Sequence, residues 1–403
     1  MRERRSGWES RAGRSVRGNA GRALGLLLAF AAPLGCDRGP PQGGEAFGKP
    51  AKRIAPAEQE VSLDAPMQSC VRRVLGTARL EEKASVMPLG FRKVPEPQDS
   101  TWDPALVRAV VPLGDRLVVL DAGLKQLAIL GPDLTLVRRF GREGGGPGEL
   151  REPMALAVDA DLAQIYVLDI GNRRIAVFDT TGAALGTRAG DVPGGVSIAA
   201  RRDTVFFSHF VMPGAGGRQP ARTAMLSALA PAERAASPLV SVADGDRDPG
   251  RFPMPGPNTF EVRVSDRYLA LFVGASGHVD IYRGGDRVGT VRVCMPPALA
   301  RAYARQRRAQ AGKPRLSQML YPMLTDVMLR GDTVFTIGPM PDARGRLHVD
   351  RYRVDGTDLG SIVIPIGDSA YYPQYLRFWS GPTDLVAYGS HGTILRWRLR
   401  LVE

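Results

Sequence analysis

Cysteine and histidine are scarce in this chain, which has three cysteines and four histidines among its 403 residues. Metal sites built from these side chains need several of them at close spacing, whereas Cys70 and Cys294 are far apart in the sequence. The Gly-x-Ser-x-Gly turn of serine hydrolases and the His-Glu-x-x-His helix of zinc peptidases are absent as well. The sequence therefore contains no recognisable catalytic motif.

Long apolar runs are missing after the first 36 residues. That first segment combines seven arginines and two glutamates with the apolar run Ala23 to Ala32, and it ends in Pro33-Leu34-Gly35-Cys36. A basic segment, a short apolar run and small residues in this order are typical of a signal peptide, which we assign to residues 1–36. The signal peptide predicts export. Because no later segment has the ~18 apolar residues of a membrane span, we expect the remainder to be soluble.

The end of the signal peptide, Leu34-Gly35-Cys36, resembles a lipobox, the motif in which a bacterial lipoprotein is cut before a cysteine that receives the lipid. Pro33 departs from this motif, which normally has an aliphatic residue at that position. The resemblance implies that Cys36 carries a lipid anchor. It also implies a place in the cell envelope, on the periplasmic side of the inner or outer membrane. The alternative is an ordinary signal peptide cut nearby, which leaves Cys36 free.

Residues 37–60 are rich in Gly, Pro and Ala. Because such a composition cannot bury a core, we expect a flexible linker that holds the folded part away from a surface. Beyond it, Cys70 and Cys294 can form a disulfide in an oxidising compartment. Two buried thiols that never meet are the alternative.

The net charge of +13 does not indicate a nucleic-acid partner. Seven arginines belong to the signal peptide, and most of the remaining basic residues are scattered along the chain, as on a solvated surface. The one dense group lies between Arg301 and Arg315. Its flanking sequence, residues 297–311, consists of good helix formers and stops at Gly312, which predicts a short helix. A solvated insertion and a surface that docks on acidic lipid or a partner are its two interpretations.

From residue 61 onward, short apolar runs alternate with Gly, Pro, Asp and Asn, which predicts an all-β domain. Residues 106–140 and 153–188 each contain four such runs separated by tight turns, and this unit is one blade of a β-propeller. Weaker copies begin near residues 196, 261, 325 and 375. We therefore predict a six-bladed propeller of four-stranded blades over residues 61–403. The predicted helix falls between blades four and five. Strand material between Val61 and Pro97 is expected to pair with the last run and close the ring.

The segment Ile165 to Asp179 resembles the NHL repeat, in which a strand ending in Asp leads through a Gly-Asn turn into the next strand. Residues 140–153 look like the linker that precedes such a blade in bacterial six-bladed propeller lipoproteins. The resemblance implies a six-bladed propeller in which Asp121 and Asp169 brace the turns that follow them. It implies little about activity, because this fold has many functions.

Two groups of polar side chains are candidate sites on the loop face. Residues 142–152 connect the first two blades, and the glycines from Gly144 to Gly148 are better explained by turn geometry than by a phosphate loop, since a strand follows them. The four histidines fall at or after the connection between second and third strands of successive blades, so we expect them to share one face. They could bind a metal or transfer protons. Because His278 and His348 fall in the slot that Arg174 holds in its repeat, a structural role in packing between blades is the alternative. The candidate rim consists of Arg142, Glu143, Arg151, Glu152, His209, His278, His348 and His391.

These features favour a monomeric scaffold that binds an unknown protein or small molecule at the cell envelope, with no cofactor that can be named. The alternative from a different class is a metal-assisted hydrolase or lyase with its site on the loop face. For neither function does the sequence alone identify a set of residues that form one site.

Overall fold

The computed structural model describes the chain with gaps. The described residues are 59–61, 73–86, 102–188, 195–211, 223–231, 236–244, 260–273, 277–294, 301, 305, 324–338, 345–365, 375–389 and 393–402. The predicted signal peptide, Cys36, Cys70 and His391 lie outside these residues, as do nearly all of the predicted linker and of the predicted helix. Residues 59–60, at the end of the predicted linker, belong to a strand.

The described part of the chain is all-β, and most of its strands form antiparallel sheets in which consecutive strands are neighbours. The two repeats that the sequence shows most clearly are two such sheets, which we call blades. The first consists of β3 (Val107–Leu113), β4 (Arg116–Asp121), β5 (Gln126–Leu130) and β6 (Leu136–Phe140). The second consists of β9 (Pro153–Asp159), β10 (Gln164–Asp169), β11 (Arg174–Asp179) and β12 (Ala184–Arg188).

The connection between these blades contains the short parallel pair β7 (Arg142–Glu143) and β8 (Glu149–Leu150). The turn after β10 is the 3-10 helix η2 (Ile170–Asn172). Two further blades follow. One consists of β13 (Gly195–Arg201), β14 (Thr204–Val211), β15 (Thr223–Leu229) and β16 (Ser237–Asp244), with β1 (Gln59–Val61) added in parallel to β16. The other consists of β17 (Phe260–Val264), β18 (Leu269–Val273), β19 (His278–Arg283) and β20 (Asp286–Arg292).

The C-terminal strands form a larger, eight-stranded sheet. Its first half is the blade β21 (Asp326–Arg330), β22 (Thr333–Ile337), β23 (Arg346–Arg353) and β24 (Asp358–Pro365). Its second half consists of β25 (Tyr375–Gly381), β26 (Asp384–Tyr388), β27 (Ile394–Val402) and, from the N-terminal side of the chain, β2 (Val74–Val86). β2 is therefore the outermost strand of the last blade.

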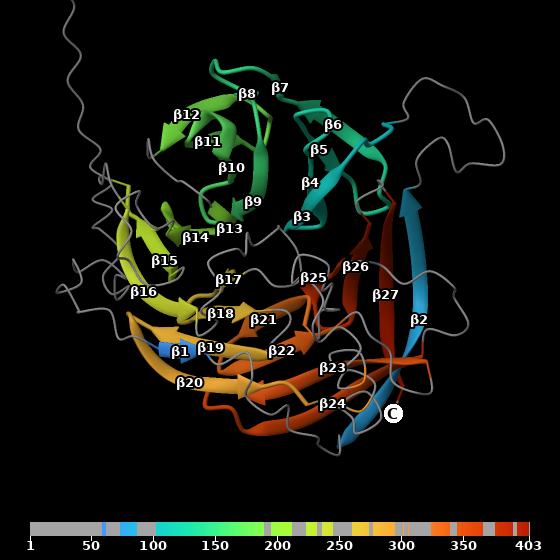
Figure 1. The fold of residues 1–403 in the computed structure, drawn as a ribbon. Helices are drawn as coiled ribbons and strands as arrows, with labels where there is room; N and C mark the ends of the chain where they lie inside the picture. The colour runs from blue at the N-terminus through green and yellow to red at the C-terminus, as the bar shows by residue number, and fades with distance from the viewer. Residues whose placement is uncertain are drawn as a thin grey trace, which may run out of the picture. The chain divides into compact units, whose positions relative to one another are not determined.

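The first strands of the blades contact one another in succession: β3, β9, β13, β17, β21 and β25, with β25 contacting β3 again. Figure 1 shows these strands on the inner sides of their sheets, and the blades lie around them. Sheets arranged radially around an axis, each a four-stranded meander, define a β-propeller. The expectation of an all-β propeller is thus confirmed.

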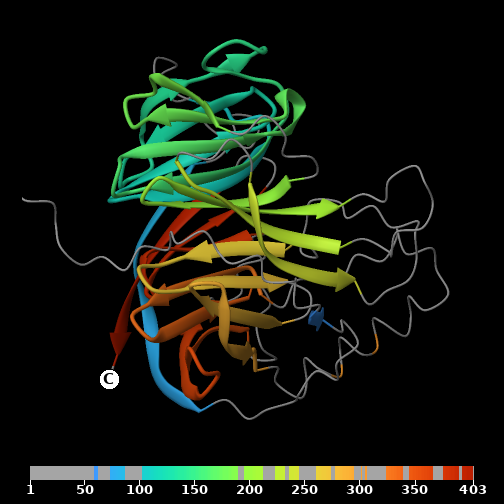
Figure 2. The ribbon, with the colours of Figure 1, turned by 90° about the vertical axis from the view of Figure 1, so that its left-hand side faces the viewer.

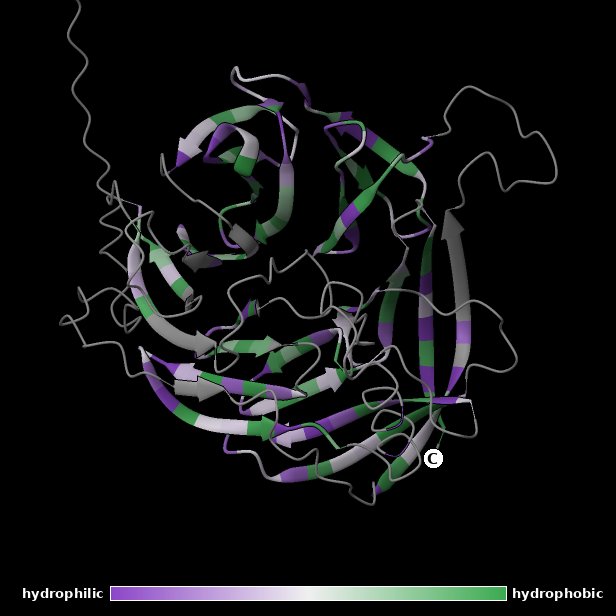
Figure 3. Ribbon diagram, viewed as in Figure 1, coloured by the Kyte–Doolittle hydropathy of each residue, from purple (hydrophilic) through white to green (hydrophobic). Residues whose placement is uncertain are grey.

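Buried side chains lie mainly between neighbouring blades, because each sheet presents an apolar face to each neighbour. Middle strands such as β4 and β10 are apolar and buried over nearly their whole length, whereas the outermost strand β12 is mostly exposed; Figure 3 shows the hydropathy along each strand. One cluster joins Leu120 and Leu127 to Ile165 and Phe178 of the next blade. Each such side chain, when fully buried, contributes about 1.5–3 kcal/mol that an isolated blade would lose.

The last blade packs against the first in the same way. Val107, Val119 and Leu130 form one cluster with Val386 and Ile394, so the apolar interface continues from the C-terminal blade to the β3–β6 blade. Trp379 adds a hydrogen bond across this interface, from its indole Nε1 to the carbonyl oxygen of Gly114 at 3.1 Å. Both blades would otherwise expose these faces to water.

The outer edge of the last blade is covered by β2, which runs beside β27 (Figures 1 and 2). The two strands are antiparallel, and their register runs from Thr77 opposite Val402 to Val86 opposite Ile394. β2 also pairs in parallel with β24 of the preceding blade. The predicted pairing of the segment between residues 61 and 97 with the last strand is therefore present, and it gives the exposed edge of β27 a partner.

Buried aspartates brace the entry to the first two blades. The Oδ1 of Asp121 accepts hydrogen bonds from the backbone N–H of Leu106 at 3.0 Å and of Gly123 at 3.0 Å. The Oδ1 of Asp169 accepts them from Arg151 at 3.1 Å and Glu152 at 2.9 Å. The two carboxylates thus tie the connection that enters each blade to the end of its second strand. The turns that follow, which the NHL resemblance names, are held as well: Gly123 donates to Asp121, and Asn172 Nδ2 donates to Asp169 Oδ2 at 2.6 Å.

Removal of β2 should weaken the ring. A chain that begins at Thr101 lacks β2 and leaves the edges of β24 and β27 unpaired, so we expect a lower urea midpoint and self-association through those edges. The control is a chain that begins at Arg73, which retains β2 and also lacks Cys70. Urea unfolding and light scattering measure the two properties. Equal midpoints and equal masses would contradict the assigned role of β2.

The brace can be tested separately. Asp169→Ala leaves the N–H groups of Arg151 and Glu152 without their acceptor, and we expect a loss of about 2–4 kcal/mol in the free energy of unfolding. Asp169→Asn retains an acceptor oxygen and should lose less. Asp266→Ala removes a carboxylate whose side chain is 89% exposed and serves as the control. A loss in Asp169→Ala no larger than that in Asp266→Ala would show that the brace is unimportant.

Candidate functional site: the axial cavity

The inner strands line a cavity of about 330 Å³ on the axis of the propeller, open on one side to solvent, which we call the axial cavity. Its walls come from β3, β9, β13, β17, β21 and β25, with Tyr388 of β26. A cavity of this size is within the range that accommodates a small ligand. All six innermost strands of the described fold contribute to it, so it is a property of the ring and of no single repeat.

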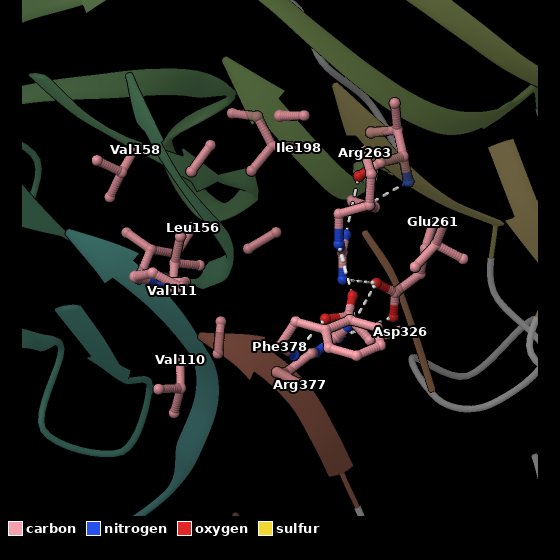
Figure 4. A pocket seen from close by; sticks show the side chains of 18 of the residues that line it. Val110, Val111, Leu156, Val158, Ile198, Glu261, Arg263, Asp326, Arg377 and Phe378 are labelled. Carbon is pink, nitrogen blue, oxygen red and sulfur yellow. Dashed lines mark hydrogen bonds and ion pairs between the residues drawn. The ribbon is translucent and has the colours of Figure 1, made fainter. Parts of the chain in front are cut away.

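One wall of the axial cavity is aliphatic. Figure 4 shows Val110, Val111, Leu156, Val158 and Ile198 on this side, from β3, β9 and β13. Val111 and Val158 are half-buried, whereas Val110, Leu156 and Ile198 are buried. This wall offers dispersion contacts and no side-chain hydrogen bond.

The opposite wall holds four charged side chains, Glu261, Arg263, Asp326 and Arg377, which we call the axial ion network (Figure 4). Arg377 donates from Nη1 to Glu261 Oε2 at 2.9 Å and from Nη2 to Glu261 Oε1 at 3.1 Å, so this pair is bidentate. Arg263 donates from Nε to Asp326 Oδ1 at 2.8 Å and from Nη2 to Glu261 Oε2 at 3.0 Å. The two arginines and the two carboxylates balance in charge.

The axial ion network connects three blades at the axis. Glu261 and Arg263 belong to β17, Asp326 to β21 and Arg377 to β25. The second oxygen of Asp326 also accepts from the backbone N–H of Phe378 at 2.8 Å, and Arg377 donates to the carbonyl of Thr325 at 2.7 Å. The network is therefore both part of the cavity wall and a link between inner strands.

Electrostatics favour the ionised form of this network. Burial on its own would raise the pKa of Glu261, but Arg377 and Arg263 outweigh it and lower the pKa to about 2. Burial likewise opposes the charge of Arg377, and Glu261 outweighs that effect, so the pKa of Arg377 lies above its usual range. Burial raises the pKa of Tyr388, whose ring stacks on that of Tyr375 with centroids 5.0 Å apart. The aromatic pair closes the wall beside Arg377.

Arg108 is the fifth charged residue of the cavity lining. It lies where the pairing of β3 with β4 shifts register between Val107 and Ala109, which is a β-bulge. Its Nε is buried and has no hydrogen-bond partner. Arg263 and Arg377 each form an ion pair with a carboxylate. Arg108 forms none with the described residues.

The predicted loop rim lies away from this cavity. Arg142, Glu143, Arg151 and Glu152 are exposed, and none of them lines the axial cavity. The guanidinium of Arg142 forms an ion pair with Glu149 at 2.8 Å, and Arg174 donates to the carbonyl oxygens of Gly146 and Glu149 at 2.9 and 2.6 Å. The glycine-rich connection is thus held by its own neighbours, in agreement with its interpretation as turn geometry. A recognition role for the rim stays a prediction.

The histidines are distributed over separate blades. His209 lies in β14 and pairs with Gly195 of the inner strand β13. In the first blade the equivalent position, paired with Val107 of β3, is Asp121. His278 begins β19, and His348 is buried in β23. None of the three lines the axial cavity, and burial lowers the pKa of His209 and of His278.

No group of three or more His, Cys, Asp or Glu side chains in the described part of the chain is arranged to hold a metal ion. Cys294 is disulfide-bonded, and its partner lies outside the described residues. Pairing with Cys70 therefore stays a prediction. Within the same described ranges, no helix is both long enough and apolar enough to cross a membrane.

The residues of the axial cavity were not among the sequence-based candidates. One signal was present in the sequence. In the fourth repeat the inner strand reads Glu261-Val262-Arg263-Val264, whereas the inner strand of the second repeat has Leu156 and Val158 and no charge before Asp159. Charges at alternate positions of an inner strand face a neighbouring inner strand, so they indicate partners at the axis.

The lowered pKa of Glu261 predicts that the free energy of unfolding depends on pH. Folding lowers this pKa from its ordinary value of 4.5 to about 2, so the unfolded chain binds the proton more tightly. The contribution of Glu261 to stability is complete above that ordinary value and is lost as the pH falls toward about 2, by on the order of 3 kcal/mol. In urea titrations at several pH values, Glu261→Gln should be less stable at pH 7 and show a shallower acid slope. Glu143→Gln controls for loss of a surface carboxylate. Equal slopes for Glu261→Gln and the unaltered protein would contradict the assignment.

Comparison with known proteins identifies a similar fold and no family. No protein-family model matches the sequence, and no curated protein matches it. The chain is similar to a solved structure from Bacteroides fragilis described as that of an exported protein, with 13% identity, a TM-score of 0.50 and coverage of 80% of this chain and 95% of that one. It also overlaps the WD40 repeats of RRP9 (11% identity, TM-score 0.43, 74% and 96% covered) and U3-55K (12% identity, TM-score 0.44, 74% and 97% covered). At these identities, the likeness to the Bacteroides structure shows the fold alone.

Proposed function

We propose that this protein is an exported, six-bladed β-propeller that acts as a binding scaffold at the cell envelope and holds a small molecule in its axial cavity. The blade count rests on the order of the inner strands, β3, β9, β13, β17, β21 and β25, which return to β3. Each neighbouring pair of blades shares one hydrophobic cluster, including the pair formed by the last blade and the first. A six-membered ring with a cluster at every interface accounts for all of these contacts.

The axial cavity is the observation that carries the binding function. It brings an aliphatic wall and a charged wall together in one concave space of about 330 Å³. Ligand sites in proteins are concave and mostly apolar, with a few fixed polar groups that orient the ligand, and the axial cavity has this composition. The loop rim around Arg142 offers exposed charges with no comparable enclosure.

Two cysteines, Cys36 and Cys294, support export and membrane anchoring. The N-terminal segment ending in Cys36 has the order of a lipoprotein signal, which would place a lipid anchor on Cys36. Cys294 is disulfide-bonded, as is typical of proteins in oxidising compartments outside the cytoplasm. In this proposal Cys70 is its partner, and the propeller lies on the periplasmic side of the inner or outer membrane.

A metal-assisted hydrolase or lyase is the alternative, and no specific observation in the described residues favours it. The carboxylates of the axial cavity, Glu261 and Asp326, are each engaged by arginine at 2.8–3.1 Å. His278 and His348, the histidines that a rim site would use, belong to different blades. We therefore favour binding over catalysis.

A neutral fluorescent probe tests the binding function. N-phenyl-1-naphthylamine, which is uncharged, should bind the protein saturably at one site, with an increase in fluorescence. Val158→Phe adds a ring to the half-buried aliphatic wall and should remove the saturable signal. Val288→Phe makes the same change at an exposed position on β20, 41% exposed, and should leave it intact. Absence of saturable binding, or equal binding by both variants, would refute the proposed function.

A further inference from the structure

Arg108 gives the axial cavity an unbalanced positive charge. Five charged residues line it, and four of them form the axial ion network, in which two arginines match two carboxylates. Arg108 is left over, so the lining carries one positive charge in excess. Of the residues that line this cavity, Arg108 alone has a charge without an opposite charge in the described structure.

An unmatched guanidinium beside an apolar wall has an energetic cost. Charged groups removed from water are stable only when they are paired or hydrogen-bonded. Arg108 is half-buried, and its Nε–H, which is withdrawn from water, donates to no acceptor in the described structure. The β-bulge at Arg108 fixes this residue at the start of an inner strand, where the backbone of β3 faces the axis. An anion bound in the cavity would supply the missing partner.

The aliphatic wall specifies the rest of the ligand. Arg108 lies on the same strand as Val111, which packs with Val158 of β9 in one hydrophobic cluster, and both valines are half-buried at the cavity. A ligand whose negative group meets Arg108 therefore extends its body along side chains that offer only dispersion contacts. A flexible hydrocarbon chain suits such a wall, whereas a polyhydroxylated body would lose its hydrogen bonds to water there.

We propose that the axial cavity binds an aliphatic monocarboxylate, with the carboxylate paired to Arg108 and the hydrocarbon on the aliphatic wall, chiefly on the half-buried Val111 and Val158. The guanidinium and the carboxylate match in geometry, because the planar donor fork bonds both oxygens at once. One negative charge balances the excess of the lining. This inference rests on the proposed function and names the ligand class for the same cavity.

Other charge types fit less well. An alkylammonium ion would meet the uncompensated Arg108, and the carboxylates that could attract it are each engaged by arginine. A dianion would leave one negative charge unmatched inside the ring. An uncharged alcohol of the same length would satisfy the apolar wall alone and leave Arg108 as it is. The proposed site is therefore expected to bind these three classes of ligand more weakly than the monocarboxylate.

Isothermal titration calorimetry with decanoate, 1-decanol and decylamine, each below its aggregation concentration, measures that ranking. We expect decanoate to bind the full chain at one site per molecule and more tightly than decanol by about tenfold to a hundredfold, the range expected for a charge-assisted hydrogen-bonded pair. Arg108→Met keeps the length of the side chain and removes the charge, so decanoate should then bind no more tightly than decanol. Arg108→Lys should retain part of the preference.

Arg351→Met is the matched control. Arg351 lies in β23, its Nε is also buried without a hydrogen-bond partner, and it does not line the axial cavity. The variant removes the same charge from the same kind of environment and should bind decanoate like the unaltered protein. A loss of decanoate binding in both variants would show that net charge is responsible and would overturn the role of Arg108. Thermal unfolding of each variant verifies that it is folded.

The neutral naphthylamine probe separates failure of this inference from failure of the proposed function. If the probe binds and is excluded by Val158→Phe, but decanoate binds no better than decanol or Arg108→Met leaves its affinity unchanged, the cavity is a binding site for a different ligand class and the monocarboxylate is refuted. If neither the probe nor any of the decyl compounds binds, the proposed function fails together with the inference. Tighter binding of decylamine than of decanoate would also refute the assignment.

Discussion

The structure depends on the need of every sheet to be covered on both faces. Each blade has apolar side chains on two sides, and a flat stack of such sheets would leave its first and last faces in water. Packing Val107 and Leu130 of the first blade against Val386 and Ile394 of the last removes both exposed faces at once. The axial cavity is a geometric consequence, because sheets that fan out around an axis leave a space where their inner strands meet.

That space is lined differently on its two sides because the inner strands of the repeats differ in sequence. The first three inner strands keep aliphatic residues such as Val111 and Leu156, whereas the last three carry Glu261, Asp326 and Arg377. An ion network that was buried without balance would destabilise the ring, so the pairing within it is a condition for its presence there. Arg108 departs from this rule, and a departure inside an otherwise matched lining is where a ligand has most to contribute.

The sequence predicted the propeller well because strand length, turns and the alternation of apolar residues are local properties. Residues 106–140 and 153–188 were recognisable as blades, and Asp121 and Asp169 were expected to brace the turns that follow them; their bonds to the connections that enter the blades were not expected. The axial cavity could not be predicted in this way. Glu261 and Arg377 meet only because β17 and β25 converge at the axis, and no local pattern relates two positions so distant in the chain. The histidines were expected on one face of the ring, in successive repeats; His209, His278 and His348 lie in three different blades, and a shared function for them stays a prediction.

The position of β2 has a consequence for the order in which the molecule can form. Its antiparallel partner, β27, is at residues 394–402, so the final blade lacks one of its strands until nearly the whole sequence is available. A ring that needs its latest segment to meet one of its earliest is slow to complete, because such a contact spans most of the chain. For the proposed exported protein this delay is favourable, since no closed ring forms before β27 is available to pair with β2.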